Sequence, residues 1–402
     1  MTLLNRIWNL FPVKASRFSR PLVLFHSDDW GLAGIRDRQG FEELKGAGLD
    51  LGERPYDFYS LETAEDLRAL YDVLRRHRDS AGRPPCMVFN FVLSNVDFLR
   101  VMESGFRRLP MVSLDGGLPG NWRRPGLLAA YEEGIREGFL YPALHGVTHF
   151  CQRAAKRVMG GGDERASLLR RLHRAHTPMI PGRTPWLGFE YRDEPSAGGD
   201  GWLDFSEQRN LIQEGKNLFQ RTFGKAPLSA CAPGYRANKD TLRGWAEAGI
   251  RVVQEGPGFA RAPYFDSHGL LHLCRNIPFE PALDAKGSIE GKILKKAEEA
   301  FQEGWPAVLC MHSINFHSTL KNHRDMTLEK LDRFLTLLES RFGDLLYLHD
   351  LDLWQILHEG RFCREGKEVE IPLRNRWEPS PDLDYYLKKL CGGRARNSEE
   401  RI

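Results

Sequence analysis

Two aspartates stand side by side at the end of a short apolar run in the stretch VLFHSDDWG. Adjacent carboxylates repel one another and are costly to bury, so they need a metal ion, a basic partner or a substrate to hold them. A second stretch, HGVTH, places His145 and His149 four residues apart. On one turn of a helix these imidazoles would share a face. With a carboxylate from Asp28 or Asp29 they would form a metal site that leaves positions open for water and substrate.

A metal in such a site lowers the pKa of water, and the aspartate that does not bind the metal can take the proton. His312 ends the run AVLCMH and could protonate a leaving group. In CAPGYR, the backbone N–H groups of Gly234 and Tyr235 could stabilise an oxyanion. Each signal alone is common in proteins without such chemistry. Their joint occurrence at the ends of apolar runs indicates a hydrolytic site.

The elements that must position these residues follow an alternating pattern. Short apolar runs predict strands at 21–25, 86–93, 141–145, 228–233, 250–254, 307–312 and 344–350. Amphipathic patterns predict helices at 62–79, 125–138, 239–249, 290–304 and 327–343. The stretch 263–273 predicts a small hairpin. Alternating strands and helices predict a parallel α/β sheet or barrel, in which the carboxyl ends of the strands form the active site.

One segment interrupts this pattern. Residues 151–208 are rich in Arg, Gly and Pro, and a helix is expected only at 164–174. Long segments of this kind in compact domains often cover a functional site. We therefore expect one barrel domain over residues 21–363, with the insertion at 151–208 acting as a lid.

The two ends of the chain differ from the barrel. Residues 1–20 are amphipathic and basic, which predicts a first helix packed on the domain. A weak contact with a membrane surface, through Trp8 and its apolar neighbours, is the alternative. Residues 364–402 form a polar tail whose end is expected to be disordered.

Composition excludes several classes of protein. The 57 basic and 54 acidic residues leave a formal charge of only +3, which argues against general binding of nucleic acids. No apolar run approaches the roughly 20 residues of a transmembrane helix. The seven cysteines contain no CxxC pair, and no secretory pattern opens the chain. We therefore expect a cytoplasmic protein without a disulfide framework.

At these motifs the sequence resembles the polysaccharide deacetylases of the NodB-homology type, carbohydrate esterase family 4, over about residues 20–355. The match of VLFHSDDWG to the first family motif implies that Asp28 is the base and Asp29 a metal ligand. EGIREGFLYPALHGVTH resembles the second motif and implies that His145 and His149 are ligands. VLCMH resembles the last motif and implies that His312 is the acid. The resemblance implies a distorted (β/α)7-type barrel of the polysaccharide deacetylase/glycoside hydrolase superfamily.

The third motif departs from the family pattern. In the family an arginine ahead of the proline orients the base, whereas here Cys231 and Ala232 occupy that stretch. Arg236, which follows the proline, is the candidate to replace it. Asn95 at a strand end and Trp186 in the insertion are candidates for substrate contact. A turn and a packing role, respectively, are equally good interpretations of these two residues.

The sequence thus predicts a metal-dependent hydrolase that removes an acyl group, N-acetyl in the first instance, from an amide on a carbohydrate. Zinc is the expected metal, and iron, cobalt, nickel or manganese would also fit. The expected substrate is a soluble or carrier-linked precursor. Two alternatives stay open, namely a hydrolase of another non-peptide C–N bond, such as a ureide, and an inactive barrel that binds carbohydrate.

Overall fold

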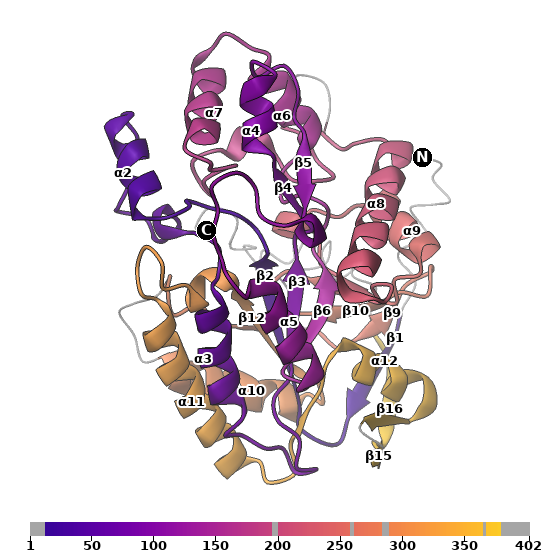
Figure 1. The fold of residues 1–402 in the computed structure, drawn as a ribbon. Coiled ribbons are helices and arrows are strands. Elements are labelled where there is room, and N and C mark those ends of the chain that lie inside the picture. Colours follow the sequence, from indigo (N-terminus) through magenta and orange to yellow (C-terminus); the bar gives the residue numbers. More distant parts are fainter. Residues whose placement is uncertain (1–12, 195–199, 258–260, 284–288, 365–366, 379–402) are drawn as a thin grey trace, which may run out of the picture.

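The computed structural model describes residues 13–194, 200–257, 261–283, 289–364 and 367–378. Its centre is a parallel sheet with the strand order β11-β12-β2-β3-β6-β7-β8-β10 (Figure 1). These strands are β2 (Leu22–Trp30), β3 (Met87–Phe91), β6 (Leu140–Leu144), β7 (Ser229–Ala230), β8 (Val252–Glu255), β10 (Leu271–Cys274), β11 (Ile277–Pro278) and β12 (Ala307–His312). Every residue of β2 is buried, as expected for a strand at the centre of an α/β fold.

One stretch of chain joins the two ends of this order. β10 pairs with β8, and β11, which follows after only Arg275 and Asn276, pairs with β12. The backbone N–H of Asn276 also donates to the carbonyl of Val308 in β12. No ladder joins β10 directly to β12 in the described residues, so the barrel is distorted at this point. Counting β10 and β11 as one position gives seven strands, which confirms the predicted (β/α)7-type architecture.

Two strand predictions need correction. The run at 344–350 forms only β13 (Leu346–Tyr347), which pairs with the first residues of β2 and lies off the main strand order. The predicted hairpin exists as β9 (Tyr264–Phe265) and β10. Its second strand, however, is also a barrel strand, because β10 pairs with β8 on its other side.

Helices cover the outside of the barrel (Figure 1). Five confirm the predicted ones, namely α3 (Ala64–Leu74), α5 (Leu127–Arg136), α9 (Lys239–Ala248), α10 (Ile289–Gln302) and α11 (Arg324–Arg341). Helices that were not predicted include α2 (Arg38–Gly46), α8 (Phe205–Phe223) and α12 (Asp350–Glu359). α3 shows why these sequences form helices. Thr63 and Asp66 form a capping box at its start, and Leu67, Leu70 and Leu74 are buried along one face.

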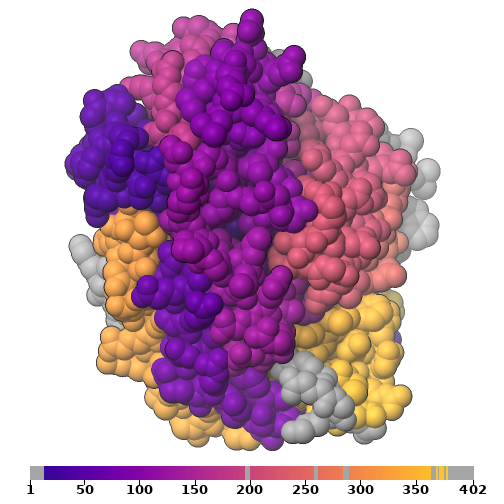
Figure 2. All heavy atoms as spheres, viewed as in Figure 1, coloured from indigo at the N-terminus to yellow at the C-terminus, as the bar shows by residue number. Residues whose placement is uncertain are grey.

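The insertion lies at the end of the barrel to which the arrows of β2, β3 and β6 point (Figure 1). It contains α6 (Gln152–Met159), α7 (Glu164–Arg174) and the short η3 (Pro185–Leu187), and α7 matches the predicted helix. Beside it lie β4 (Ser94–Val96), α4 (Phe98–Glu103) and β5 (Met111–Ser113). In the space-filling view these elements form the upper part of the molecule, next to the indigo surface of α2 (Figure 2).

The ends of the chain add an edge to the sheet. β1 (Val13–Phe18) pairs with β16 (Leu373–Glu378) and with β9, so the expected first helix is wrong for residues 13–18. Residues 1–12, including Trp8, lie outside the described residues. Part of the predicted polar tail is ordered, because β14 (Arg361–Arg364) and β15 (Lys367–Glu370) form a hairpin ahead of β16. Residues 379–402 lie outside the described residues.

Aromatic packing stabilises the part of β2 that carries the two aspartates. The ring of Trp30 stacks on that of Phe89 with centroids 3.7 Å apart, and the ring of Phe316 lies 5.7 Å away. Trp30 is fully buried, so the end of β2 is held in place by apolar contacts. Among the described helices, none is both long and apolar enough to cross a lipid bilayer.

Candidate active site

β2 ends in a bulge that brings two neighbouring carboxylates to one end of the barrel. Its register against β3 shifts between Ser27 and Trp30, and Asp29 adopts a φ of 70°. Adjacent side chains of a regular strand point to opposite faces, and a bulge with a positive φ redirects one of them. Asp28 is 1% exposed and Asp29 4% exposed. Each buried carboxylate has its own set of partners.

Asp29 lies against the two predicted histidine ligands. Its Oδ1 is 3.3 Å from Nε2 of His145 and 3.2 Å from Nε2 of His149. One donor atom from each of the three residues lies within 4.8 Å of the other two. Oδ1 of Asp29 is buried and accepts no aligned hydrogen bond from the residues that the structure describes. Two imidazoles and a carboxylate that converge in this way fit a divalent transition metal.

The backbone orients His145 for this role. Its Nδ1–H donates to the carbonyl of Cys231 at 2.9 Å, which directs Nε2 toward Asp29. A hydrogen bond of this kind fixes the tautomer of a metal-binding histidine. Burial alone would lower the pKa of His145, but the contact with Asp29 and the charges of both aspartates raise it. The same negative field favours a metal cation.

The HGVTH segment forms an irregular loop and not the predicted helical turn. Gly146 adopts a φ of 92°, which turns the chain out of a helical path. Oε1 of Glu190, in the insertion, accepts the N–H groups of Val147 at 2.6 Å and Thr148 at 3.1 Å. Burial raises the pKa of Glu190 to about 7, against the effect of these hydrogen bonds. The two histidines therefore meet because the loop curls around Asp29.

Asp28 is held by an arginine from outside the sequence motifs. Arg275, which follows β10, donates to both oxygens of Asp28 at 2.5 and 2.7 Å, and its side chain is fully buried. Asn90 donates to Oδ1 of Asp28 at 2.8 Å. Burial would raise the pKa of Asp28, but the charge and hydrogen bonds of Arg275 hold it well below its usual value. Asp28 is therefore an ionised carboxylate at neutral pH.

Gln254 of β8 connects this pair to the barrel interior. Its Oε1 accepts from Arg275 at 2.6 Å and from Asn90 at 2.8 Å. Its Nε2 donates to Asp350 at 2.8 Å, and Asp350 also contacts His26 at 2.7 Å. Because two donors contact its oxygen and a carboxylate accepts from its nitrogen, the side-chain amide of Gln254 has only one suitable orientation. The position of Asp28 thus depends on a chain of buried side chains from several strands.

His312 stands on the other side of Asp28. Its Nε2 is 4.0 Å from Oδ2 of Asp28, and its Nδ1 is 2.6 Å from Glu280. Asn315 donates to the other oxygen of Glu280 at 2.5 Å. Burial would lower the pKa of His312, but the charge and hydrogen bond of Glu280 raise it well above its usual value. A protonated imidazole and an ionised carboxylate therefore lie side by side.

In the loop after β7, Tyr235 and Arg236 have different contacts from those that the sequence predicts. The N–H of Tyr235 donates to the carbonyl of Ala232 at 2.8 Å, so it is not available to an oxyanion. The Tyr235 hydroxyl accepts from Arg275 at 3.1 Å. Arg236 lies over the ring of Phe189 at 5.9 Å, and that ring also packs against Gly234. The arginine that holds Asp28 is Arg275, whereas Arg236 was the sequence candidate.

Asn95 and Trp186 have structural partners. Asn95 accepts the N–H of Ala33 and donates to the carbonyl of Gly31, each at 2.9 Å, and so fixes the chain that leaves β2. Trp186 is 7% exposed and belongs to the apolar core. These contacts favour a structural role over a substrate contact for both residues, in backbone hydrogen bonds for Asn95 and in packing for Trp186.

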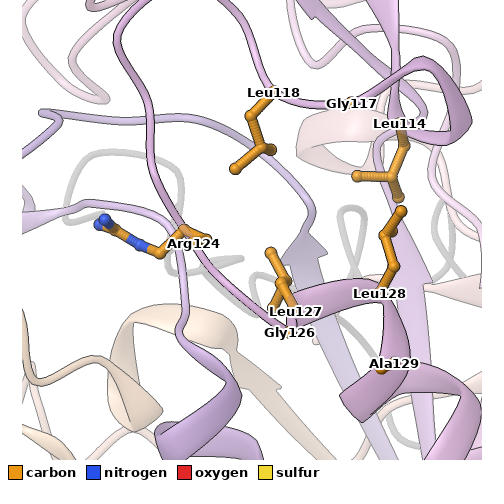
Figure 3. A pocket seen from close by; sticks show the side chains of 8 residues that line it. All are labelled: Leu114, Gly117, Leu118, Arg124, Gly126, Leu127, Leu128 and Ala129. Carbon is orange, nitrogen blue, oxygen red and sulfur yellow. The ribbon is translucent and has the colours of Figure 1, made fainter.

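A cavity of about 260 Å³ lies apart from the aspartates, between η2 (Leu114–Gly116) and the start of α5 (Figure 3). Half of the residues that line it are leucines, and the side chain of Arg124 extends away from them (Figure 3). Arg124 instead donates to the carbonyl of Leu61 at 3.1 Å. None of the predicted site residues lines this cavity.

Residues that complete the site were missed because they stand outside the motifs. Arg275 and Glu280 flank β11 in the stretch LHLCRNIPFE. Apolar residues recur there with the period of a strand, and Arg275 falls at a position where the pattern expects an apolar side chain. That exception was the available signal. Gln254 and Glu190 carried no comparable signal.

No family model and no curated protein matches this chain. Solved structures similar to it include a probable polysaccharide deacetylase from Pseudomonas aeruginosa PAO1, at 10% identity and a TM-score of 0.46, covering 85% of this chain and 92% of that one. A family 4 carbohydrate esterase from Streptomyces lividans is 10% identical, with a TM-score of 0.35 and coverage of 82% and 92%. The Puue allantoinase is 12% identical, with a TM-score of 0.42 and coverage of 85% and 91%.

Proposed function

We propose that this protein is a metal-dependent hydrolase that removes an acyl group, N-acetyl in the first instance, from an amide on a carbohydrate. The observation that carries the proposal is that two adjacent carboxylates have different partners. Asp29 faces two histidines, whereas Asp28 is held by Arg275 and lies beside His312. Metal-assisted hydrolysis of an amide uses a cation site, a base and an acid that lie close to one another.

The chain's own groups suit the proton transfers of this reaction. A divalent metal ion held by Asp29, His145 and His149 would polarise the amide carbonyl and lower the pKa of water. Asp28, ionised at neutral pH, takes a proton from the attacking water. His312, protonated by virtue of Glu280, gives a proton to the amide nitrogen as the C–N bond breaks. The products are a carboxylic acid and an amine, so atoms and charge balance.

The proposed substrate is an acylated amino sugar, free or linked to a carrier. Phe189 packs edge-on against the ring of His149, with centroids 5.8 Å apart, and Arg236 lies over the ring of Phe189. An aromatic ring and a guanidinium beside the ligand histidine are suited to a sugar ring with polar substituents. We propose zinc as the metal, because two histidines and one carboxylate suit it.

The experiment is a direct metal analysis of the purified protein followed by turnover of a panel of N-acetylated sugars and small amides. We expect about one equivalent of a transition metal and release of acetate. Asp28→Asn should keep the metal and lose at least 100-fold in turnover. Asp72→Asn, which changes a surface carboxylate with 66% exposure, is the matched control and should be unaffected.

Other outcomes select the alternatives. Turnover of small amides or ureides without turnover of acetylated sugars would select a different C–N hydrolase. Binding of sugars without any turnover by the metal-loaded protein would select an inactive barrel. Full activity of Asp28→Asn would overturn the mechanism.

A further inference from the structure

The insertion reaches into the site through Glu190. This residue is 1% exposed, so its carboxylate lies almost entirely away from solvent. Its Oε1 accepts the N–H groups of Val147 and Thr148, the two residues between Gly146 and His149. A buried carboxylate is costly unless donors satisfy it, and here the donors belong to the loop that carries both histidines.

The loop is shaped to receive this carboxylate. A Cβ atom at Gly146 would lie 2.1 Å from Oε2 of Glu190, so only glycine leaves room for the carboxylate. The φ of 92° at Gly146 is also one that other residues rarely adopt. Glycine at position 146 is thus required for two reasons. Its backbone conformation shapes the loop, and its missing side chain leaves room for Glu190.

The segment around Glu190 is anchored on both sides. Phe189, the preceding residue, packs edge-on against the ring of His149. Asp193 forms a bidentate ion pair with Arg157 of α6, with distances of 2.5 and 2.8 Å. The N–H of Cys151 donates to the carbonyl of Leu187 at 3.0 Å. The inserted segment and the histidine loop therefore form one packed unit.

We propose that Glu190 is a positioning residue that preorganises His145 and His149 for metal binding. The inference rests on the metal centre of the proposed function. Without Glu190, two N–H groups of the loop lose their acceptor, and the histidines must be ordered when the metal binds. Loss of a partner that orients a metal ligand from outside the coordination sphere typically lowers metal affinity about 10- to 100-fold.

The test measures the dissociation constants of Co²⁺ and Zn²⁺ for the full-length protein by competition with a chelator. Glu190→Ala should weaken binding about 10- to 100-fold. Glu190→Gln keeps the volume and one acceptor oxygen, so its loss should be smaller. Glu194→Gln changes a glutamate in the same insertion whose side chain is 35% exposed, and it should bind metal like the wild type.

The absorption spectrum of bound Co²⁺ supplies a readout that a merely structural role would not change. At saturation, Glu190→Gln should show altered d–d bands, because the imidazoles are held less firmly. Wild-type affinity and spectrum in a folded Glu190→Ala or Glu190→Gln variant would overturn the inference and leave the proposed function intact. If Glu190→Ala does not fold, Glu190→Gln decides. Absence of metal from the wild type, even after reconstitution, would overturn both.

Discussion

Asp28 and Asp29 are neighbours in the chain, yet they are held by different parts of the molecule. The partners of Asp28 lie on or directly after barrel strands, namely Asn90 on β3, Arg275 after β10 and His312 on β12. Asp29 faces a loop that the insertion supports through Glu190. The first environment is built from side chains on or next to several barrel strands, and the second from the single loop after β6, which the insertion supports.

This difference suggests how the proposed roles of the two aspartates, base and metal ligand, are separated. A strand-based network fixes one carboxylate in a single geometry, which suits a group that must exchange a proton at a defined position. A loop-based environment can close around a cation, because loops accommodate small changes more readily than strands. Changes to each side of the site should therefore produce distinct defects.

The largest expected effect is on metal content. Asp29→Asn keeps the shape of the side chain and removes its charge, so we expect metal affinity to fall at least 100-fold and turnover at least 1,000-fold, an order-of-magnitude estimate. Direct metal analysis checks this result beside Asp28→Asn, which should retain its metal. The reverse outcome, in which Asp28→Asn loses the metal and Asp29→Asn keeps it, would show that the two roles are exchanged.

The next effect is on stability. Arg275→Met leaves Asp28 buried without its cation, which should cost about 3–5 kcal/mol in the free energy of unfolding. Denaturant unfolding measures this loss. Arg221→Met breaks an ion pair with Asp115 in which the arginine is 55% exposed, and it should cost less than about 1 kcal/mol. Equal losses in the two variants would mean that the buried pair is not the anchor of Asp28.

The acid can be tested through pH. Glu280 raises the pKa of His312, so His312 stays protonated above the usual range of histidine. Glu280→Gln should move the alkaline limb of the kcat profile to lower pH and leave metal content unchanged. The same interaction stabilises the fold below the unfolded pKa of about 6.5, and this contribution is lost as pH rises through the higher folded pKa. An unmoved alkaline limb would exclude His312 as the acid.

The barrel strands and the four residues at the centre of the candidate site could be predicted because their signals are local. Asp28, Asp29, His145 and His149 stand in short motifs at the ends of apolar runs, and runs with strand and helix periods are recognisable without a structure. The distances around Asp29 then bring the histidines to the expected neighbour.

The remaining parts could not be predicted because they depend on contacts between distant residues. Arg275 follows the stretch 263–273, which has the pattern of a hairpin, and only the pairing of β10 with β8 places it beside Asp28. The helical turn expected for HGVTH is prevented by Gly146 and by Glu190, which is more than forty residues away along the chain. β1 was expected to be helical, and its strand state depends on pairing with β16 near the other end of the chain.

The smallest expected effect distinguishes the two candidate arginines. Arg275→Lys removes the planar fork that contacts both oxygens of Asp28, so turnover should fall about 10- to 100-fold even though the charge is kept. Arg236→Lys changes a residue that lies over Phe189, and kcat should change by less than about threefold. Steady-state kinetics of the two variants under identical metal loading measures the contrast. If Arg236→Lys lost more kcat than Arg275→Lys, the arginine after the proline would be the one that orients the base, and the strand-based environment of Asp28 would have a structural role only.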